Sequence, residues 1–329
     1  MRSDQRIEKR GIIMLDFTEF KREFVTGCRD ILAKMAAASP SDGIEIEERS
    51  ITKAQRGELA GLIFKAPDTV CAPTYYVEDF YDGYKEGRSV EQLVMTAVQN
   101  ACHYIYHPPV LPAIDRDFLG DPAALRVRLI NRSKNRDYLK DVPFIDNCGL
   151  ALIAELRSGE FRVVVTGSLM KSFGMNRDDL FETALANSAA CDRATLYDLS
   201  DVFQSTFEDC GNLLERDPAM GPLPVSLYVL SNEDSFFGAA ALFYPGMLEK
   251  LERLMGGSFY VLPSSVHEVL LLQVTEGDEQ KLADIIKTAN MTVTTSDVFL
   301  ADDLFICERG RLRQVSYGGV VPPPGALPC

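Results

Sequence analysis

Residues 259–273 read FYVLPSSVHEVLLLQ, and this stretch predicts two buried strands joined by a tight turn. Apolar runs flank a Pro-Ser-Ser sequence, and in such turns serine hydroxyls commonly bond backbone groups. The turn also carries two hydroxyls, an imidazole and a carboxylate, on Ser264, Ser265, His267 and Glu268. Two interpretations therefore stand. The segment is either a structural turn that borders a cleft or a reaction centre.

The rest of the C-terminal third alternates short strands with helices. Strand patterns cover residues 225–232 and 236–246, and a helix follows Pro245. A further helix is expected from Asp278, and Arg309-Gly310 predicts the turn of a closing hairpin. Short strands paired by tight turns, with helices inserted, predict an α+β fold with a mainly antiparallel sheet.

The N-terminal part is more helical. Residues 16–38 place apolar side chains at helical spacing, and residues 73–109 predict two helices, with Ser89 as the N-cap of the second. The first of these two helices has an aromatic face, made by Tyr75, Tyr76, Phe80, Tyr81 and Tyr84. We interpret this face as core packing. The alternative is a ligand platform, as in a small-molecule sensor.

The middle of the chain adds a strand at 124–132, a hairpin turning at Ser158-Gly159 and a helix capped by Asn176. These patterns divide the chain into five segments. They are a translated leader or disordered segment at 1–13 ahead of a start at Met14, a helix-rich part at 14–110, an α+β part at 111–222, an α+β part at 223–317 and a disordered tail at 318–329.

Charge limits the classes of partner. The 329 residues include 48 acidic and 34 basic side chains, for a formal net charge of −14. This balance disfavours a nucleic-acid backbone or an anionic membrane and suits a basic protein partner. No window approaches the roughly 18 apolar residues of a membrane span. The eight cysteines form no CxxC pair, and no signal peptide is evident, so we expect reduced thiols and a cytoplasmic protein.

Cofactor and metal motifs are missing from the sequence. Neither the phosphate-binding GxxxxGK[ST] pattern nor GxGxxG after a strand occurs. His103 and His107 have the i, i+4 spacing of two ligands on one helix face, and Cys102 is adjacent. Zinc needs three or four ligands, and no HExxH motif supports this pair. We therefore expect neither a cofactor nor a metal site.

Two functions from different classes remain. The first is a non-enzymatic accessory or regulatory protein that acts by binding a protein partner. The alternative is a hydrolase or transferase in which Ser264 or Ser265 is the nucleophile, His267 its base and Glu268 the orienting acid. Asn232 and Tyr244, at neighbouring strand ends, would line the binding cleft.

Spacing limits the catalytic alternative. In an extended segment His267 and Glu268 point to opposite faces. Ser265 and His267 would share a face with their Cα atoms about 7 Å apart, which is long for a direct hydrogen bond. A turn at Pro263 would shorten this separation, so the sequence leaves both functions open.

Four stretches of the chain, at 127–156, 178–189, 227–272 and 297–315, resemble an uncharacterised bacterial family. It is a domain-of-unknown-function family common in gut-dwelling Gram-positive anaerobes, with a distant similarity to YtpQ-type proteins. The resemblance runs from Leu15 to Val315 and is most specific between Tyr228 and Leu272. It implies a soluble bacterial cytoplasmic protein, and it brings no established activity and no catalytic residues.

Overall fold

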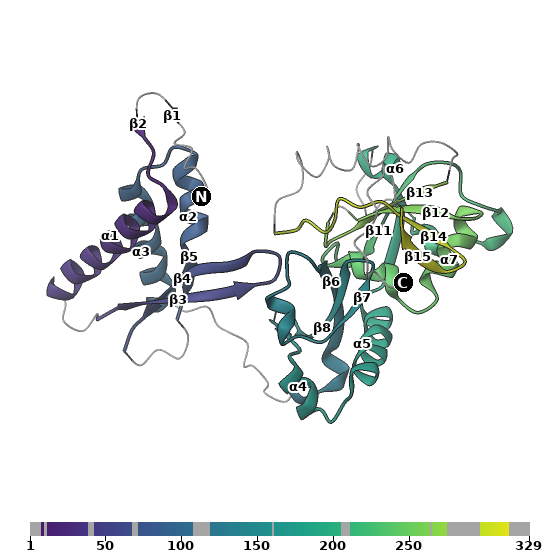
Figure 1. Cartoon of the computed structure of the whole chain (residues 1–329), viewed down its shortest axis with the longest axis horizontal. Helices are drawn as coiled ribbons and strands as arrows, with labels where there is room; N and C mark the ends of the chain where they lie inside the picture. Colours follow the sequence, from purple (N-terminus) through teal and green to yellow (C-terminus); the bar gives the residue numbers. More distant parts are fainter. Residues whose placement is uncertain are drawn as a thin grey trace, which may run out of the picture. The chain divides into compact units, whose positions relative to one another are not determined.

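The structure is a computed structural model that describes residues 8–9, 12–38, 43–67, 72–107, 119–159, 161–204, 211–263, 265–274 and 297–315. The chain forms two compact units. Unit 1 comprises Met1–Lys53 and Glu58–Ile114, and unit 2 comprises Ala54–Gly57 and Asp115–Cys329. Helices and antiparallel sheets occur in both units, which confirms the α+β class (Figure 1).

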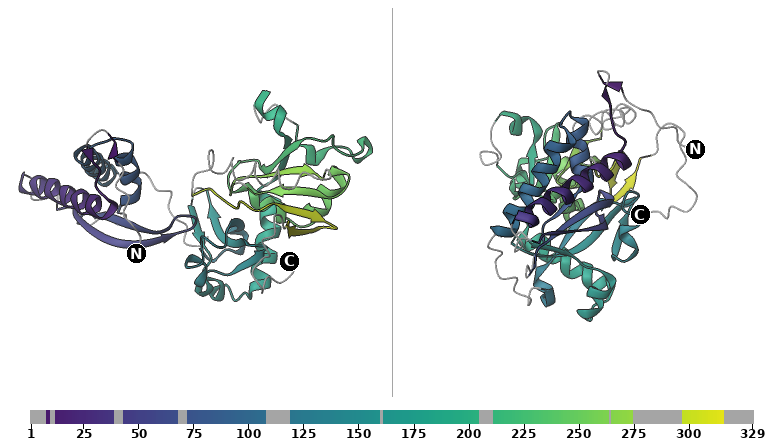
Figure 2. Two further views of the ribbon diagram at one scale, coloured as in Figure 1. Left: turned by 45° about the horizontal axis from the view of Figure 1, so that its top comes forward. Right: turned by 90° about the vertical axis from the view of Figure 1, so that its left-hand side faces the viewer.

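Unit 1 packs three helices on one face of a three-stranded sheet of order β3-β4-β5. The long β3–β4 hairpin curves beneath the helices (Figure 2). Ser89 is the N-cap of the third helix, as predicted, and it forms a capping box with Gln92. The elements are α1 (Phe17–Ala38), β3 (Glu45–Lys53), β4 (Gly57–Lys65), β5 (Thr74–Tyr76), α2 (Val77–Lys85) and α3 (Val90–Tyr106).

The aromatic face of α2 packs against α1. The ring of Phe80 lies 4.7 Å from that of Phe24, and Tyr81 lies 5.2 Å from Phe20, between ring centroids. Phe20 and Phe24 are fully buried. The interpretation as core packing is confirmed for these side chains. Tyr76 differs, because its ring lies 4.3 Å from the ammonium of Lys53.

Unit 2 contains two antiparallel sheets. In the smaller one, β8 pairs with β6 along one edge and with β7 and β9 along the other. The larger sheet has the order β10-β11-β13-β12-β14-β15. The strands are β6 (Leu125–Asn131), β7 (Phe144–Asn147), β8 (Leu150–Ser158), β9 (Phe161–Val164), β10 (Ala194–Asp198), β11 (Leu227–Asn232), β12 (Phe259–Leu262), β13 (Val269–Gln273), β14 (Phe305–Glu308) and β15 (Arg311–Gln314).

Two helices of unit 2 begin or end at signals that the sequence carries. Asn176 and Asp179 form a capping box at the start of α5, and Gly256, in the left-handed conformation, ends α7. The α-helices are α4 (Gly167–Ser172), α5 (Arg177–Cys191), α6 (Leu199–Gln204) and α7 (Met247–Met255). The 3₁₀-helices are η2 (Pro122–Ala124), η3 (Tyr138–Lys140), η5 (Leu213–Glu215), η6 (Pro218–Met220) and η7 (Gly238–Phe243).

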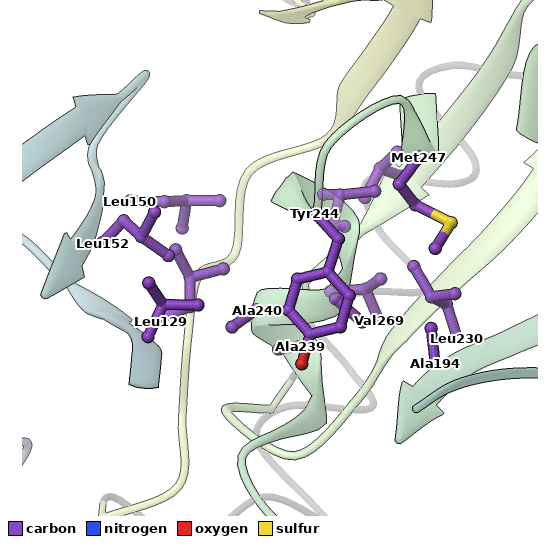
Figure 3. Packing of buried hydrophobic residues seen from close by; sticks show 14 of the residues in the cluster. Leu129, Leu150, Leu152, Ala194, Leu230, Ala239, Ala240, Tyr244, Met247 and Val269 are labelled. Carbon is purple, nitrogen blue, oxygen red and sulfur yellow. The ribbon is translucent and has the colours of Figure 1, made fainter. Parts of the chain in front are cut away.

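One core joins the two sheets of unit 2. Leu129 and Leu152 of the smaller sheet share a cluster with Leu230 and Val269 of the larger sheet. The alanines of η7 lie between these two groups (Figure 3). The boundary expected between residues 222 and 223 therefore does not divide the core, because residues on both sides of it contribute to one cluster.

The strand predicted at 236–246 is wrong, because η7 occupies most of this segment. Phe237, at a φ of 55°, adopts the left-handed conformation and ends the extended path. The small side chains that follow let the helical turn approach the β-strands closely, and Ala239 and Ala241 are fully buried. The apolar pattern of this segment therefore reflects its burial and does not indicate an extended backbone.

Some expectations fall outside the described residues or differ from them. The helix from Asp278 and the tail at 318–329 lie outside. Within the segment expected to be a leader or disordered, Glu8–Lys9 and Ile12–Ile13 pair as the short strands β1 and β2. Cys148 is disulfide-bonded, contrary to the expectation of reduced thiols, whereas Cys28, Cys191 and Cys307 are free.

Candidate functional site

Ser265 lies in the turn between β12 and β13, where it forms an isolated bridge with Phe299. Its hydroxyl oxygen accepts a hydrogen bond of 2.8 Å from the backbone N–H of His267. The hydroxyl also bonds the carboxyl of Glu268, whose pKa is raised by burial and lowered in part by this bond. Ser264 lies outside the described residues. The hydroxyl of Ser265 thus bonds two residues of its own turn, the backbone of His267 and the side chain of Glu268.

The imidazole of His267 has its own backbone partner. Its Nδ1 accepts a hydrogen bond of 3.2 Å from the N–H of Phe237, and the two rings stack with centroids 5.5 Å apart and planes 6° apart. An Nδ1 that accepts carries no proton, so the ring is neutral. Burial and the nearby charge of Arg128 both lower the pKa of His267, which agrees with a neutral ring.

His267→Asn is expected to make the protein less sensitive to acid. Because the folded pKa of His267 is lowered, its contribution to stability is present above the unfolded value of 6.5 and is lost as the pH falls through the folded pKa. The surrounding charges are Arg128, which lowers the pKa, and Asp297, which raises it. Asparagine offers an acceptor to Phe237 and does not titrate.

The measurement is urea unfolding of the wild type and His267→Asn over a series of pH values. We expect the wild type to lose stability more steeply than the variant below about pH 6.5. Parallel curves for the two proteins would contradict the assignment of this acid sensitivity to His267.

Asn232 fixes the loop that follows β11. Its side-chain amide donates to the carbonyl of Phe236 at 3.0 Å and accepts from the N–H of Phe236 at 3.1 Å. Asn232 is 4% exposed, so it does not face a cleft. Instead it holds the loop of Phe236 and Phe237, whose ring centroids lie 5.1 Å and 5.5 Å from that of His267.

Tyr244 lies apart from this group. It is buried at the end of η7, among the packed side chains shown in Figure 3. It lines a hollow of about 240 Å³ together with Asn212, Met247 and Lys250, and the lining does not include His267. Burial, followed by the charge of Asp192, raises the pKa of the Tyr244 hydroxyl.

Sequence reasoning missed a group of arginines on one face of the smaller sheet. Arginines at alternate positions of a strand share a face. The strand register places Arg126 opposite Glu155 and Arg157 opposite Arg162. The four arginines therefore lie on one face of the smaller sheet, the face that is turned away from the main core. The signal was present in the period-two spacing of arginines within the apolar strand LRVRLIN. The four arginines are Arg126, Arg128, Arg157 and Arg162.

Three carboxylates partner most of these arginines. Asp192 lies 3.0 Å from Arg157 and 3.9 Å from Arg126. Asp234 lies 2.7 Å from Arg157. Glu155, which is 3% exposed, lies 3.6 Å from Nε of Arg162. These ion pairs cover three of the four guanidinium groups.

Arg128 is the exception. Among the described residues no carboxylate lies within 4.0 Å of it, and its Nε is buried without a hydrogen-bond partner. Its guanidinium carbon lies instead 3.7 Å from the ring centroid of Phe237. Burial lowers the pKa of Arg128, and the charge of Glu155 offsets this effect in part. The cation is thus held mainly by an aromatic face.

We define the arginine–aromatic cluster as Arg128, Arg162, Phe236, Phe237 and His267. Arg162 lies 4.4 Å from the ring of Phe236, and the rings of Phe236 and Phe237 lie 4.1 Å apart. Phe236 keeps 37% of its surface exposed. The cluster offers donors, a positive charge and apolar area to a ligand, and its imidazole is already bonded to the backbone.

Metal ligands do not gather in the part of the chain that the structure describes. No group of three or more His, Cys, Asp or Glu side chains there is arranged to hold a metal ion. The rings of His103 and His107 lie 5.1 Å apart at the end of α3, which is the pairing that the sequence spacing gives. Also within the described residues, no helix is long and apolar enough to pass through a bilayer.

These features define a class: an α+β protein of two units whose second unit carries a cluster of arginine and aromatic side chains. The chain belongs to the family of unknown function DUF5688, whose sequence profile matches residues 17–309. No curated protein and no solved structure matches this chain.

Proposed function

We propose that this is a non-enzymatic accessory or regulatory protein that binds a protein partner through the arginine–aromatic cluster. The observation that carries the proposal is the exposure of Phe236, a large apolar side chain whose backbone is fastened on both sides by Asn232. Aromatic and arginine side chains are enriched at the centres of protein interfaces. A rigid aromatic residue beside Arg162 fits that pattern because little side-chain freedom is lost on binding.

The hydrolase or transferase alternative has weaker support. A nucleophile and its base should lie within hydrogen-bond reach of each other. The described hydrogen bonds of Ser265 lead to the backbone of His267 and to Glu268, and Nδ1 of His267 bonds Phe237. These contacts stabilise the turn. Catalysis at this turn stays the alternative hypothesis, with Ser264 as the remaining hydroxyl.

The cellular setting belongs to the same proposal. The sequence resemblance supports a bacterial, cytoplasmic protein of gut Gram-positive anaerobes, with YtpQ-type proteins as distant relatives. The net charge of −14 supports a partner with a basic surface rather than a nucleic acid. The cluster itself is cationic. The segment of the partner that contacts it would therefore be neutral or acidic, although the partner's surface as a whole is basic.

Phe236→Ala tests this function. The tagged protein is purified from its native host after cross-linking, and co-purified proteins are quantified by mass spectrometry. Met220→Ala is the matched control, because Met220 is an exposed apolar residue of the same unit at 65% exposure. We expect Phe236→Ala to reduce recovery of the partner about tenfold, as loss of a central aromatic contact does, and Met220→Ala to leave it unchanged.

The result that overturns the proposal is equal recovery with Phe236→Ala and the wild type, or no co-purified protein with either. In that case a panel of esters and amides is tested with the wild type and His267→Asn. Hydrolysis that the variant loses while it stays folded would establish the catalytic alternative.

A further inference from the structure

We propose that the arginine–aromatic cluster contains a carboxylate-binding site centred on Arg128, which receives an aspartate or glutamate side chain of the partner. This inference rests on the proposed function, since it names the chemical group that the partner contributes. It concerns a residue that the sequence patterns did not single out. Three independent features of the described residues support it.

The first feature is the balance of charge on the sheet face. Four guanidinium groups lie there with three carboxylates, so one positive charge remains without a partner among the described residues. That charge is on Arg128, which has no carboxylate within 4.0 Å among the described residues and feels the charge of Glu155 only from a longer distance. A charge held away from water without a close counterion is costly. One carboxylate from a ligand would restore the balance.

The second feature is the way Arg128 is held. Its guanidinium stacks 3.7 Å from the ring centroid of Phe237, and Phe237 in turn stacks on His267. Stacking occupies the flat face of the guanidinium and leaves its edge, where the N–H groups lie. The N–H groups at that edge form a fork that matches the two oxygens of a carboxylate. The group is therefore oriented before the ligand arrives.

The third feature is the unsatisfied polar groups beside it. Nε of Arg128, Nε of Arg162 and Oε2 of Glu155 are all buried without a hydrogen-bond partner in the described structure. Such atoms are few in native proteins, and a group of them indicates a missing partner. Burial raises the pKa of Glu155, and the charges of Arg128, Arg162 and Arg157 lower it.

The charge of the site selects a carboxylate over a phosphate. A single uncompensated cation matches a monoanion, whereas a dianionic phosphate would bring a second negative charge close to Glu155. The exposed ring of Phe236 adds apolar area next to the charge, which suits the methylene groups of an acidic side chain or the ring of an aromatic acid. Benzoate is thus a suitable small probe, and benzamide is its neutral counterpart.

The experiment measures binding of benzoate and benzamide to the full chain by ligand-observed NMR saturation transfer. The variants are Arg128→Gln, Arg128→Lys and the control Arg193→Gln, with circular dichroism as the check on folding. Arg193 is an exposed arginine of the same unit that pairs with Glu233 at 3.2 Å and with Glu215. We expect the wild type to prefer benzoate, and Arg128→Gln to weaken benzoate binding about tenfold, because a charge-assisted fork is lost.

Arg128→Lys keeps the charge over Phe237 and loses the fork, so it gives a second readout if the glutamine variant does not fold. Its benzoate affinity should fall by about threefold to tenfold, and Arg193→Gln should bind like the wild type. Benzoate binding that is equal to benzamide binding, absent from the wild type or unchanged in the folded Arg128 variants overturns the site. Loss of the partner in Phe236→Ala together with such a result would leave the proposed function standing and remove only the carboxylate inference.

Discussion

Replacing Phe24 by alanine is expected to lower the free energy of unfolding by about 4 kcal/mol. Phe24 lies in α1, is fully buried and contacts two other rings, with centroid distances of 5.5 Å to Phe20 and 4.7 Å to Phe80. Truncation removes the buried ring and leaves a cavity that its neighbours only partly fill. The loss would fall on the core that joins the three helices of unit 1 to its sheet.

Urea unfolding followed by circular dichroism measures this loss as a shift of the midpoint at constant slope. Phe24→Leu is the graded control, because it keeps most of the apolar volume and should cost less than about 1.5 kcal/mol. A loss below about 1 kcal/mol for Phe24→Ala would contradict core packing.

The same rings bear on the sensor alternative. A hollow of about 380 Å³ in unit 1 is lined by charged side chains that include Lys21, Glu48 and Glu78. None of the residues around it is aromatic. The rings of α2 are thus used against α1 instead of lining this hollow, which fits a large effect on stability in Phe24→Ala.

Local signals in the sequence predicted the parts of the fold that local chemistry decides. Capping residues at Ser89 and Asn176, and turn residues at Ser158-Gly159 and Arg309-Gly310, lie at the ends of elements in the structure. Each of these sites satisfies backbone groups with residues only a few positions away. A single sequence contains all the information that such contacts need.

The candidate site depends on contacts between distant parts of the chain, and the sequence predicted it only in part. His267 was singled out because it lies beside Ser264, Ser265 and Glu268 in the sequence, and Asn232 because it ends a neighbouring predicted strand. Arg128 was not singled out, because its distinguishing contact is with the ring of Phe237. Phe237 lies in the loop that follows β11, a strand of the larger sheet. The register of β6 with β8 then decides which carboxylates reach which arginines. No local propensity encodes that register without the packed core.

The 3₁₀-helix η7 shows how tertiary packing overrides an apolar pattern. Residues 236–246 are apolar enough for a buried strand, yet Gly238 lets the chain turn against β11. The alanines of η7 pack between the two sheets, where their small side chains allow close contact. The predicted strand therefore gives way to a 3₁₀-helix in this segment.

Gly238→Ala is expected to be among the most harmful single changes in unit 2, with a loss of about 3 kcal/mol in the free energy of unfolding. A Cβ on Gly238 would overlap the hydroxyl of Ser231 and would lie 2.5 Å from the backbone nitrogen of Asn232 and 2.8 Å from the carbonyl oxygen of His267. Two of these three atoms belong to the backbone, so they cannot move aside as the end of a flexible side chain can. The loop that carries Phe236 and Phe237 would have to shift.

This shift gives Gly238→Ala a second expected effect, on binding. Phe237 would move away from Arg128 and from the ring of His267, so the arginine–aromatic cluster would lose its geometry together with stability. Gly120→Ala is the matched control, because a Cβ there meets nothing within 4 Å, and its effect on stability should stay within about 0.5 kcal/mol. Thermal and urea unfolding, with benzoate binding measured on the same samples, test both effects. A Gly238→Ala protein as stable as Gly120→Ala, with benzoate binding intact, would show that the close approach of η7 to β11 does not position the cluster.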